Sequence, residues 1–252
     1  MSSVSALSRE DIFKELDLWP VWRLRSAPAS PAETKVATEI HIDAQSKSEP
    51  AKLDTALSWD ALREAVNTCT RCKLHKTRTQ GVFGVGDQQA DWLIVGEAPG
   101  ADEDAQGEPF VGQAGRLLDA MLAAIGLRRG ENVYIANVLK SRPPGNRNPE
   151  PDEVAACMPY LLQQIELLQP KIILAMGRFA AQNLLASKDA IASLRGRVHH
   201  FQGVPLIVTY HPAYLLRTLT DKAKAWEDLC LARQTYAALQ SDASMQTDFV
   251  HA

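Results

Sequence analysis

Cys69 and Cys72 form a CxxC motif, a spacing at which two thiols can act together. The 252-residue chain has two more cysteines, Cys157 and Cys230, both far along the sequence. Thiolates in a CxxC motif bind metal ions or carry out redox chemistry, and buried cysteines also serve as small apolar core residues. The motif by itself leaves metal binding, redox chemistry and core packing open.

Basic side chains gather in three stretches, although the net charge is −3. Residues 65–86 and 132–149 contain no acidic residue, and the third group lies at 195–200. The basic residues and histidines of these groups are Arg71, Lys73, Lys76 and Arg78, then Lys140, Arg142 and Arg147, then Arg195, Arg197, His199 and His200. Together they are compatible with a polyanion lying across one face of the protein, and each group alone is equally well explained as solvated surface.

Four apolar runs alternate with helical patterns, so the sequence predicts an α/β fold with three layers, α/β/α, around a central four-stranded parallel sheet. The predicted strands are residues 92–98, 132–139, 171–177 and 204–212, and the helical stretches are 58–66, 112–127, 151–168 and 178–186. In such sheets the loops after the carboxyl ends of the strands form the ligand site. These loops are GEAPGADED, KSRPPGNR, GRFAA and HPAYLLR, and they hold most of the unusual residues.

The chain is 46% hydrophobic, which is enough for a substantial core. No apolar run reaches the roughly 18–20 residues of a membrane span, and the first residues lack a signal-peptide pattern. We therefore expect a cytoplasmic protein that does not contact membranes. The predicted divisions are a short amphipathic motif at 1–25, a flexible linker at 26–55, a main domain at 56–243 and a disordered tail at 244–252.

Three long motifs, in this order, identify a resemblance: GEAPGADEDAQGEPFVGQAGRLL, YIANVLKSRPPGNRNP and TYHPAYLLR. Over about residues 58–240 the chain resembles the family 4 uracil-DNA glycosylases, the iron-sulfur branch of the uracil-DNA glycosylase superfamily. The resemblance implies an enzyme that extrudes uracil from DNA and hydrolyses its N-glycosidic bond, leaving an abasic site for base excision repair.

The resemblance assigns three central roles in the pocket. Phe110 matches the aromatic residue that stacks on uracil, Asn137 the amide that pairs with the uracil edge, and His211 the hydrogen-bond donor to uracil O2. The loop Glu97, Ala98, Pro99 and Gly100 completes the expected uracil site. We expect the catalytic residues to be His211, Glu97 and Asn137.

The first motif has Ala98 where the better-known branch of the superfamily carries an aspartate that positions water. The resemblance therefore implies a dissociative cleavage in which the water is held by backbone groups or by another acid of this loop. Glu97, Glu103 and Asp104 are the candidates, and the sequence does not rank them. A side chain of the 97–104 loop is expected to exclude the methyl group of thymine.

Binding of DNA is expected from the loops after the second and fourth strands. Arg142 and Arg147 match a basic loop suited to phosphates, and Arg217 could hold another phosphate. In the superfamily, the loop after the histidine enters the minor groove, so Tyr214 or Leu215 would fill the gap left by the extruded nucleotide. The expected substrate is uracil-containing DNA, double- or single-stranded.

The resemblance also implies a [4Fe-4S] cluster held by four cysteines. Cys69, Cys72 and Cys157 match three of the ligands, but Ser141 occupies the fourth position. Since thiolates are the usual ligands, three possibilities stay open: Ser141 ligates through oxygen, the cluster has three irons, or the site is empty. Cys230 is interpreted as a core residue.

Two other functions remain as alternatives to a monofunctional glycosylase. The first is a DNA-binding module or damage sensor with little turnover. The second is a relative that traps DNA covalently, which would need a basic, histidine-containing insertion; RGRVHHFQG has only the length of a hairpin. We further expect a monomer, and residues 9–25 either pack on the domain or dock to a repair or replication protein.

Overall fold

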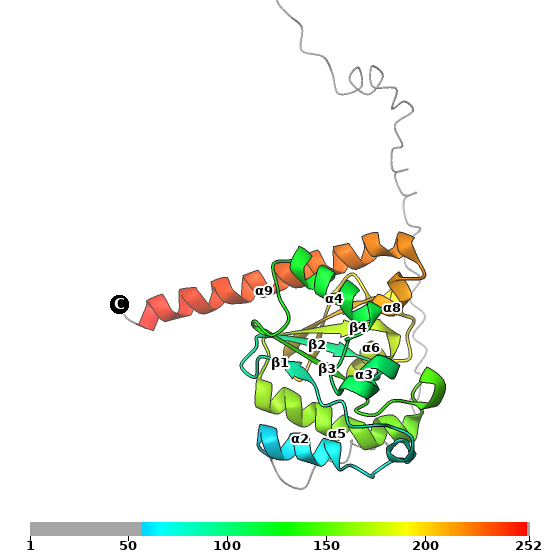
Figure 1. Ribbon diagram of the computed structural model, residues 1–252. Coiled ribbons are helices and arrows are strands. Elements are labelled where there is room, and N and C mark those ends of the chain that lie inside the picture. The colour runs from blue at the N-terminus through cyan, green and yellow to red at the C-terminus, as the bar shows by residue number, and fades with distance from the viewer. Residues whose placement is uncertain (1–56, 251–252) are drawn as a thin grey trace, which may run out of the picture. The chain divides into compact units, whose positions relative to one another are not determined.

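The computed structural model of the protein describes residues 57–250, which form an α/β domain (Figure 1). The predicted N-terminal motif and linker, and with them the docking segment 9–25, lie outside the described residues. None of the described helices is both long and apolar enough to cross a bilayer.

A six-stranded sheet forms the centre of the domain, in the order β1-β3-β2-β4-β6-β5. All four predicted strands are present, as β2, β3, β4 and β6, and each pairs in parallel with its neighbours in the order β3-β2-β4-β6. The prediction of a four-stranded sheet was nevertheless incomplete, because an antiparallel strand is added at each edge. The strands are β1 (Val85–Gly86), β2 (Trp92–Gly96), β3 (Val133–Asn137), β4 (Ile172–Met176), β5 (Val198–Phe201) and β6 (Val204–Thr209).

The two edge strands were missed for different reasons. β1 is only two residues long, too short to show alternation. β5 is half-exposed and joins β6 through a two-residue turn, Gln202 and Gly203, both with positive φ. The RGRVHHFQG segment is therefore a hairpin of ordinary length, as its sequence indicates.

Helices cover both faces of the sheet. They are α2 (Trp59–Asn67), α3 (Ala101–Gln106), α4 (Gln113–Ala124), α5 (Pro151–Leu168), α6 (Gly177–Leu185), α7 (Ile191–Leu194), α8 (Pro212–Leu215) and α9 (Lys222–Val250), with short 3₁₀ turns at Lys73–Lys76, Pro144–Asn146 and Leu219–Asp221. In Figure 1, α4 and α9 lie on one side of the sheet and α2 and α5 on the other. The first helix begins as expected, with the Ser58 hydroxyl accepting from the Ala61 amide.

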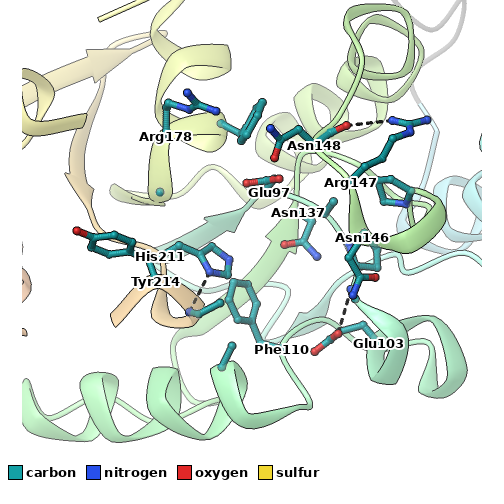
Figure 2. A pocket seen from close by; sticks show the side chains of 18 of the residues that line it. Glu97, Glu103, Phe110, Asn137, Asn146, Arg147, Asn148, Arg178, His211 and Tyr214 are labelled. Carbon is teal, nitrogen blue, oxygen red and sulfur yellow. Dashed lines mark hydrogen bonds between the residues drawn. The ribbon is translucent and has the colours of Figure 1, made fainter. Parts of the chain in front are cut away.

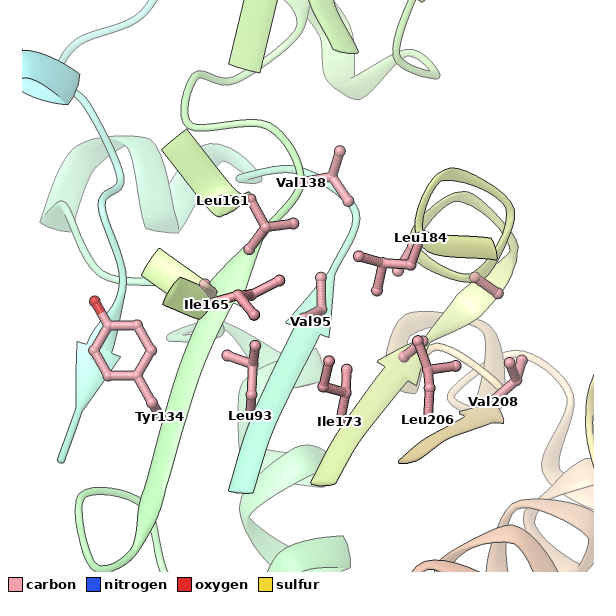
Figure 3. Close-up of a cluster of buried hydrophobic side chains, with 14 of the residues drawn as sticks. Leu93, Val95, Tyr134, Val138, Leu161, Ile165, Ile173, Leu184, Leu206 and Val208 are labelled. Atoms are coloured by element: carbon pink, nitrogen blue, oxygen red, sulfur yellow. The ribbon is translucent and has the colours of Figure 1, made fainter. Parts of the chain in front are cut away.

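Alternating residues of each strand supply two separate cores. Leu93 and Val95 of β2 pack with Leu161 of α5 and Leu184 of α6 (Figure 3). The intervening Ile94 belongs to the other core. That core contains apolar residues of α4 and α9, among them Leu118, Leu122, Ala225 and Leu229. Because both faces of the inner strands are buried, their sequences are continuous apolar runs rather than alternating ones.

The last helix differs from what the sequence predicts. α9 extends through Val250, so residues 244–250 are helical where a disordered tail was expected. The segment contains no proline or glycine to end the helix once its first turns are anchored on the sheet. Cys230, expected in the core, lies on this helix and is only half-buried.

Candidate active site

A cavity of about 710 Å³ opens where β2, β3, β4 and β6 end. Segments that follow each of these four strands contribute to its lining, as expected for the carboxyl edge of a parallel sheet. Figure 2 shows Glu97, Asn137, Phe110 and His211 around the same space. The structure thus brings together the residues to which the sequence assigned uracil binding.

Asn137 ends β3 beside Gly96, its partner on β2. Its side chain is 2% exposed, and its Oδ1 has no hydrogen-bond partner among the described residues. A Cβ atom on Gly96 would lie 2.3 Å from this oxygen and 2.6 Å from the Phe110 ring, so only glycine admits both side chains. An unpaired buried acceptor costs about 1–3 kcal/mol, which indicates an oxygen kept free for a ligand.

Phe110 is held in a backbone conformation that is uncommon for its type. Its φ is +57°, in the left-handed region, and its side chain is buried. Arg129 fixes the segment by donating to the carbonyl oxygens of Pro109 and Phe110 at 3.0 and 2.9 Å. The Phe110 ring stacks near His211, with centroids 5.3 Å apart and planes at 25°. Strain of this kind persists where surrounding contacts enforce it, often at functional sites.

His211 caps the N-terminus of α8 and has a defined tautomer. Its Nδ1 accepts from the Ala213 amide at 3.2 Å, which leaves the proton of the neutral ring on Nε2. Burial, assisted by the charge of Arg217 and opposed by Glu103, lowers the pKa of His211 to about 4. At neutral pH the ring is therefore uncharged and offers an Nε2–H donor.

The structure separates the three acids that the sequence could not rank. Asp104 is buried and accepts from the Thr79 amide and hydroxyl, so it anchors α3 to the preceding loop. Glu103 accepts from the amides of Gly100, Val111 and Gly112 and holds the two ends of the first loop together. These contacts give both residues positions in the framework of the site.

Glu97 lines the cavity, as Glu103 does, but its carboxylate is not tied to the loops. Its backbone carbonyl oxygen accepts from the Leu139 amide at 3.0 Å, but its carboxylate accepts no hydrogen bond from the described part of the chain. Burial raises the pKa of Glu97 to about 7, and the positive charge of Arg178 opposes the rise. Ala98 lies beside it, half-buried against an apolar cluster that contains Leu139 and Cys157. The Glu97 carboxylate is therefore free to bind a water molecule, and a pKa of about 7 allows it to be ionised near neutral pH.

Residues 83–230 match the family model of the uracil DNA glycosylase superfamily. A type-4 uracil-DNA glycosylase of Archaeoglobus fulgidus is 50% identical over 167 residues, covering 63% of this chain and 83% of that protein. This chain belongs to the type-4 uracil-DNA glycosylase family. The corresponding protein of Thermotoga maritima is 44% identical, with 66% and 86% covered. A type-5 uracil-DNA glycosylase of Thermus thermophilus is less similar, at 32% identity over 153 residues.

In this type-4 family member, the loop after His211 is arranged differently from the prediction. Leu215 is 1% exposed and packs in the core, so it is not available to enter DNA. Tyr214 stacks on Tyr210 with centroids 5.1 Å apart, and its hydroxyl donates to Asp221 at 2.6 Å. The apolar side chain exposed in this loop is Leu216, at 39%. The error arose because one turn of helix, α8, turns Leu215 inward and leaves its neighbour outside.

The three arginines predicted to bind phosphate differ in whether their side chains are already paired within the protein. Arg147 forms a two-pronged ion pair with Glu153, with Nη1 2.9 Å from Oε2, so its charge is already neutralised. Arg142 donates to the Asn146 side chain at 2.7 Å and remains half-exposed. Arg217 is exposed at the cavity rim, and its contact with a phosphate stays a prediction.

Sequence reasoning gave no role to several lining residues, among them Asn146, Arg178 and Phe179. The GRFAA loop was singled out as part of the site edge, but its side chains were given no role. Gly177, which opens this loop, has φ +88°, and a Cβ there would lie 2.9 Å from the His211 Cβ. That glycine was the available signal in the sequence that the loop approaches His211.

The cysteine positions do not form one ligand group. Cys72 packs against the apolar cluster that contains Cys157, and its interaction with Cys157 lowers the pKa of Cys72 to about 6. Cys69 packs instead in a separate apolar cluster with Tyr160. Within the described residues no three His, Cys, Asp or Glu side chains are grouped to hold a metal. The donor set of this chain therefore does not fit the expected [4Fe-4S] cluster.

Proposed function

We propose that this protein is a uracil-DNA glycosylase that extrudes uracil from DNA and hydrolyses its N-glycosidic bond, leaving an abasic site for base excision repair. Membership of the type-4 family supports the activity. The observation that carries the assignment to this cavity is the unpaired Oδ1 of Asn137, buried and facing the pocket. No framework role accounts for a buried acceptor without a donor.

Uracil recognition follows from the donors and acceptors at the site. Oδ1 of Asn137 would accept the N3–H of uracil, and the amide nitrogen would donate to O4. Phe110 would stack on the base, and the 97–100 segment would border its C5 edge and leave no room for a methyl group. Cytosine presents an acceptor at N3, which would face the Asn137 oxygen without a hydrogen bond.

Cleavage requires that the departing base carry the bonding electrons. As the bond between N1 and the sugar breaks, negative charge develops on uracil O2, where the Nε2–H of His211 would donate. A neutral histidine suits this role because it stabilises the charge without giving up its proton. Glu97 as carboxylate would orient the water that attacks the sugar cation from the other face.

The lining residues include no lysine, so a Schiff-base lyase step has no nucleophile in this cavity. We therefore propose a monofunctional enzyme whose substrate is uracil-containing DNA, single- or double-stranded. Arg142 and Arg217 would contact phosphates, and Leu216 would take the place that the extruded nucleotide leaves.

An excision assay tests this function. A labelled oligonucleotide with one uracil is incubated with the full-length protein, treated with alkali and resolved on a denaturing gel. We expect cleavage at the uracil by the natural protein and by His200→Ala, an exposed histidine on β5. Asn137→Ala and His211→Ala should lower the rate by about 10² or more.

Intact strands at excess protein would contradict the enzyme. If the protein still bound the uracil oligonucleotide, the result would favour a binding module or damage sensor. A protein–DNA adduct that survives denaturing electrophoresis would favour covalent trapping instead. That outcome has little support in the structure, because His199 and His200 lie on a plain hairpin rather than on an insertion.

A further inference from the structure

The region of the CxxC motif is organised around one arginine. Arg78 follows this motif in the chain, and its guanidinium donates four hydrogen bonds. Three go to carbonyl oxygens, those of Val66 at 3.1 Å, Asn67 at 2.6 Å and Cys69 at 3.1 Å. The fourth goes to the Ser141 hydroxyl at 2.9 Å. One side chain thus joins the end of α2, the CxxC motif and the loop that follows β3.

Ser141, which accepts the fourth of these hydrogen bonds, stands where the family pattern has a fourth cysteine. Ser141 is 4% exposed, and its oxygen accepts from a cation. A serine hydroxyl binds iron only after losing a proton that it holds far more tightly than a thiol does. The hydrogen bond from Arg78 gives the Ser141 oxygen a partner from the protein itself, so Ser141 has a structural role that needs no metal.

The thiols are arranged for packing rather than for a cluster. Cys72 and Cys157 pack in the same apolar cluster, whereas ligands of a cubane cluster each bind a different iron with inorganic sulfides between them. Cys157 also accepts from the Lys140 amide at 3.5 Å. Around this pair, Leu74 and Leu139 are fully buried and fill the space. Cys69 lies in another apolar cluster.

We propose that in this chain a hydrogen-bonded arginine, Arg78, takes the structural place of the iron-sulfur cluster, and that the protein folds without iron. The carbonyls of Val66 and Asn67 lie at the end of α2, where helical hydrogen bonds run out. Arg78 supplies these acceptors with donors and at the same time fixes the loop of Ser141. That loop continues to Asn146 at the cavity rim, whose side chain accepts from Arg142, so Arg78 supports the side of the site that would face DNA.

Iron analysis of the full-length protein tests the first part of the inference. The chain is produced with ample iron and sulfide and purified without oxygen, and its iron, acid-labile sulfide and visible absorbance are measured. We expect iron far below one atom per chain and no iron–thiolate absorbance. Three to four irons per chain, with matching sulfide, would overturn the proposal. Iron uptake on reconstitution by Ser141→Cys, but not by the natural chain, would assign the loss to position 141.

Thermal unfolding tests the role of the arginine. Arg78→Met should lower Tm by roughly 5–10 °C, because four acceptors lose a charged donor. The matched control is Arg128→Met, whose side chain is 77% exposed and pairs only with Glu131 at the surface. An equal Tm for Arg78→Met and the control would refute the arginine lock. A chelator that lowers the Tm of the natural protein would refute the iron-free fold. Neither measurement depends on excision activity, so the proposed function is tested separately.

Discussion

The proposed role of Glu97 predicts that the excision activity of this protein depends on pH in a specific way. Burial raises the pKa of Glu97 to about 7, and a water-orienting role requires the carboxylate. With this pKa, about one-tenth of the molecules carry the carboxylate at pH 6 and about nine-tenths at pH 8. The single-turnover rate of uracil excision should therefore rise about tenfold over this range, with its midpoint near pH 7.

His211 should contribute no step in that window, since its pKa of about 4 keeps it neutral throughout. The substitution Glu97→Gln keeps the shape of the side chain but cannot ionise. We expect it to lower the rate by about 10² or more and to abolish the midpoint near pH 7. Glu166→Gln, on the exposed side of α5, serves as the matched control.

The same pKa predicts an opposite effect on stability. Because the pKa of Glu97 is raised on folding, the folded chain holds this proton more tightly than the unfolded chain. Its contribution to stability is full below about pH 4.5 and is lost as the pH rises through about 7. Glu97→Gln should therefore raise Tm at pH 8 and leave it nearly unchanged at pH 4.5. If Glu97→Gln excised uracil at the natural rate and with the natural pH profile, the proposed role of Glu97 in catalysis would be refuted.

Three further substitutions test the packing of the site. Gly96→Ala should lower the excision rate by about 10² or more, because its Cβ would displace Asn137 and Phe110; an unchanged rate in the excision assay would contradict this. Lys140→Met should lower Tm by roughly 5–10 °C, because the buried side chain of Lys140 donates three hydrogen bonds. These go to the Asn137 carbonyl at 2.8 Å, to the Phe83 carbonyl and to the Gln164 side chain. The control Lys188→Met, at an exposed position, should leave Tm unchanged. Leu216→Ala should slow excision from double-stranded DNA more than from single-stranded DNA, because exposed Leu216 is proposed to fill the gap left by the extruded nucleotide. An equal loss of rate on both substrates would exclude that role. Leu215→Ala should instead lower the free energy of unfolding by about 2–5 kcal/mol, because Leu215 is buried.

Much of the inner sheet could be predicted from the sequence. The runs at β2, β3, β4 and β6 are apolar throughout because both faces of each strand are buried, and this pattern survives in the sequence. Edge strands leave a weaker trace, because β1 is short and β5 is partly solvated. The length of α9 was underestimated, since nothing in its last residues distinguishes a polar helix from a disordered tail.

Side-chain direction and pairing were harder to predict than position along the chain. Leu215 and Leu216 are adjacent and chemically identical, and only the turn of α8 decides which of them is buried. Arg147 is a residue type that often binds phosphate, but Glu153 in the first turn of α5 forms an ion pair with it. Which leucine is buried and which arginine is ion-paired depend on neighbouring residues in the folded protein, whose positions cannot be predicted from the local sequence.

By itself, the sequence determined the α/β class, the four inner strands and the loops that carry Asn137, Phe110 and His211. These features depend on short-range periodicity and on the rule that parallel strands end at a common edge. Only the tertiary structure decided that Glu97 faces the cavity while Glu103 and Asp104 support the loops, and that Ser141 is bound by Arg78. The physical reason is that each of these choices is made by hydrogen-bond partners or burial contributed by segments distant in the chain.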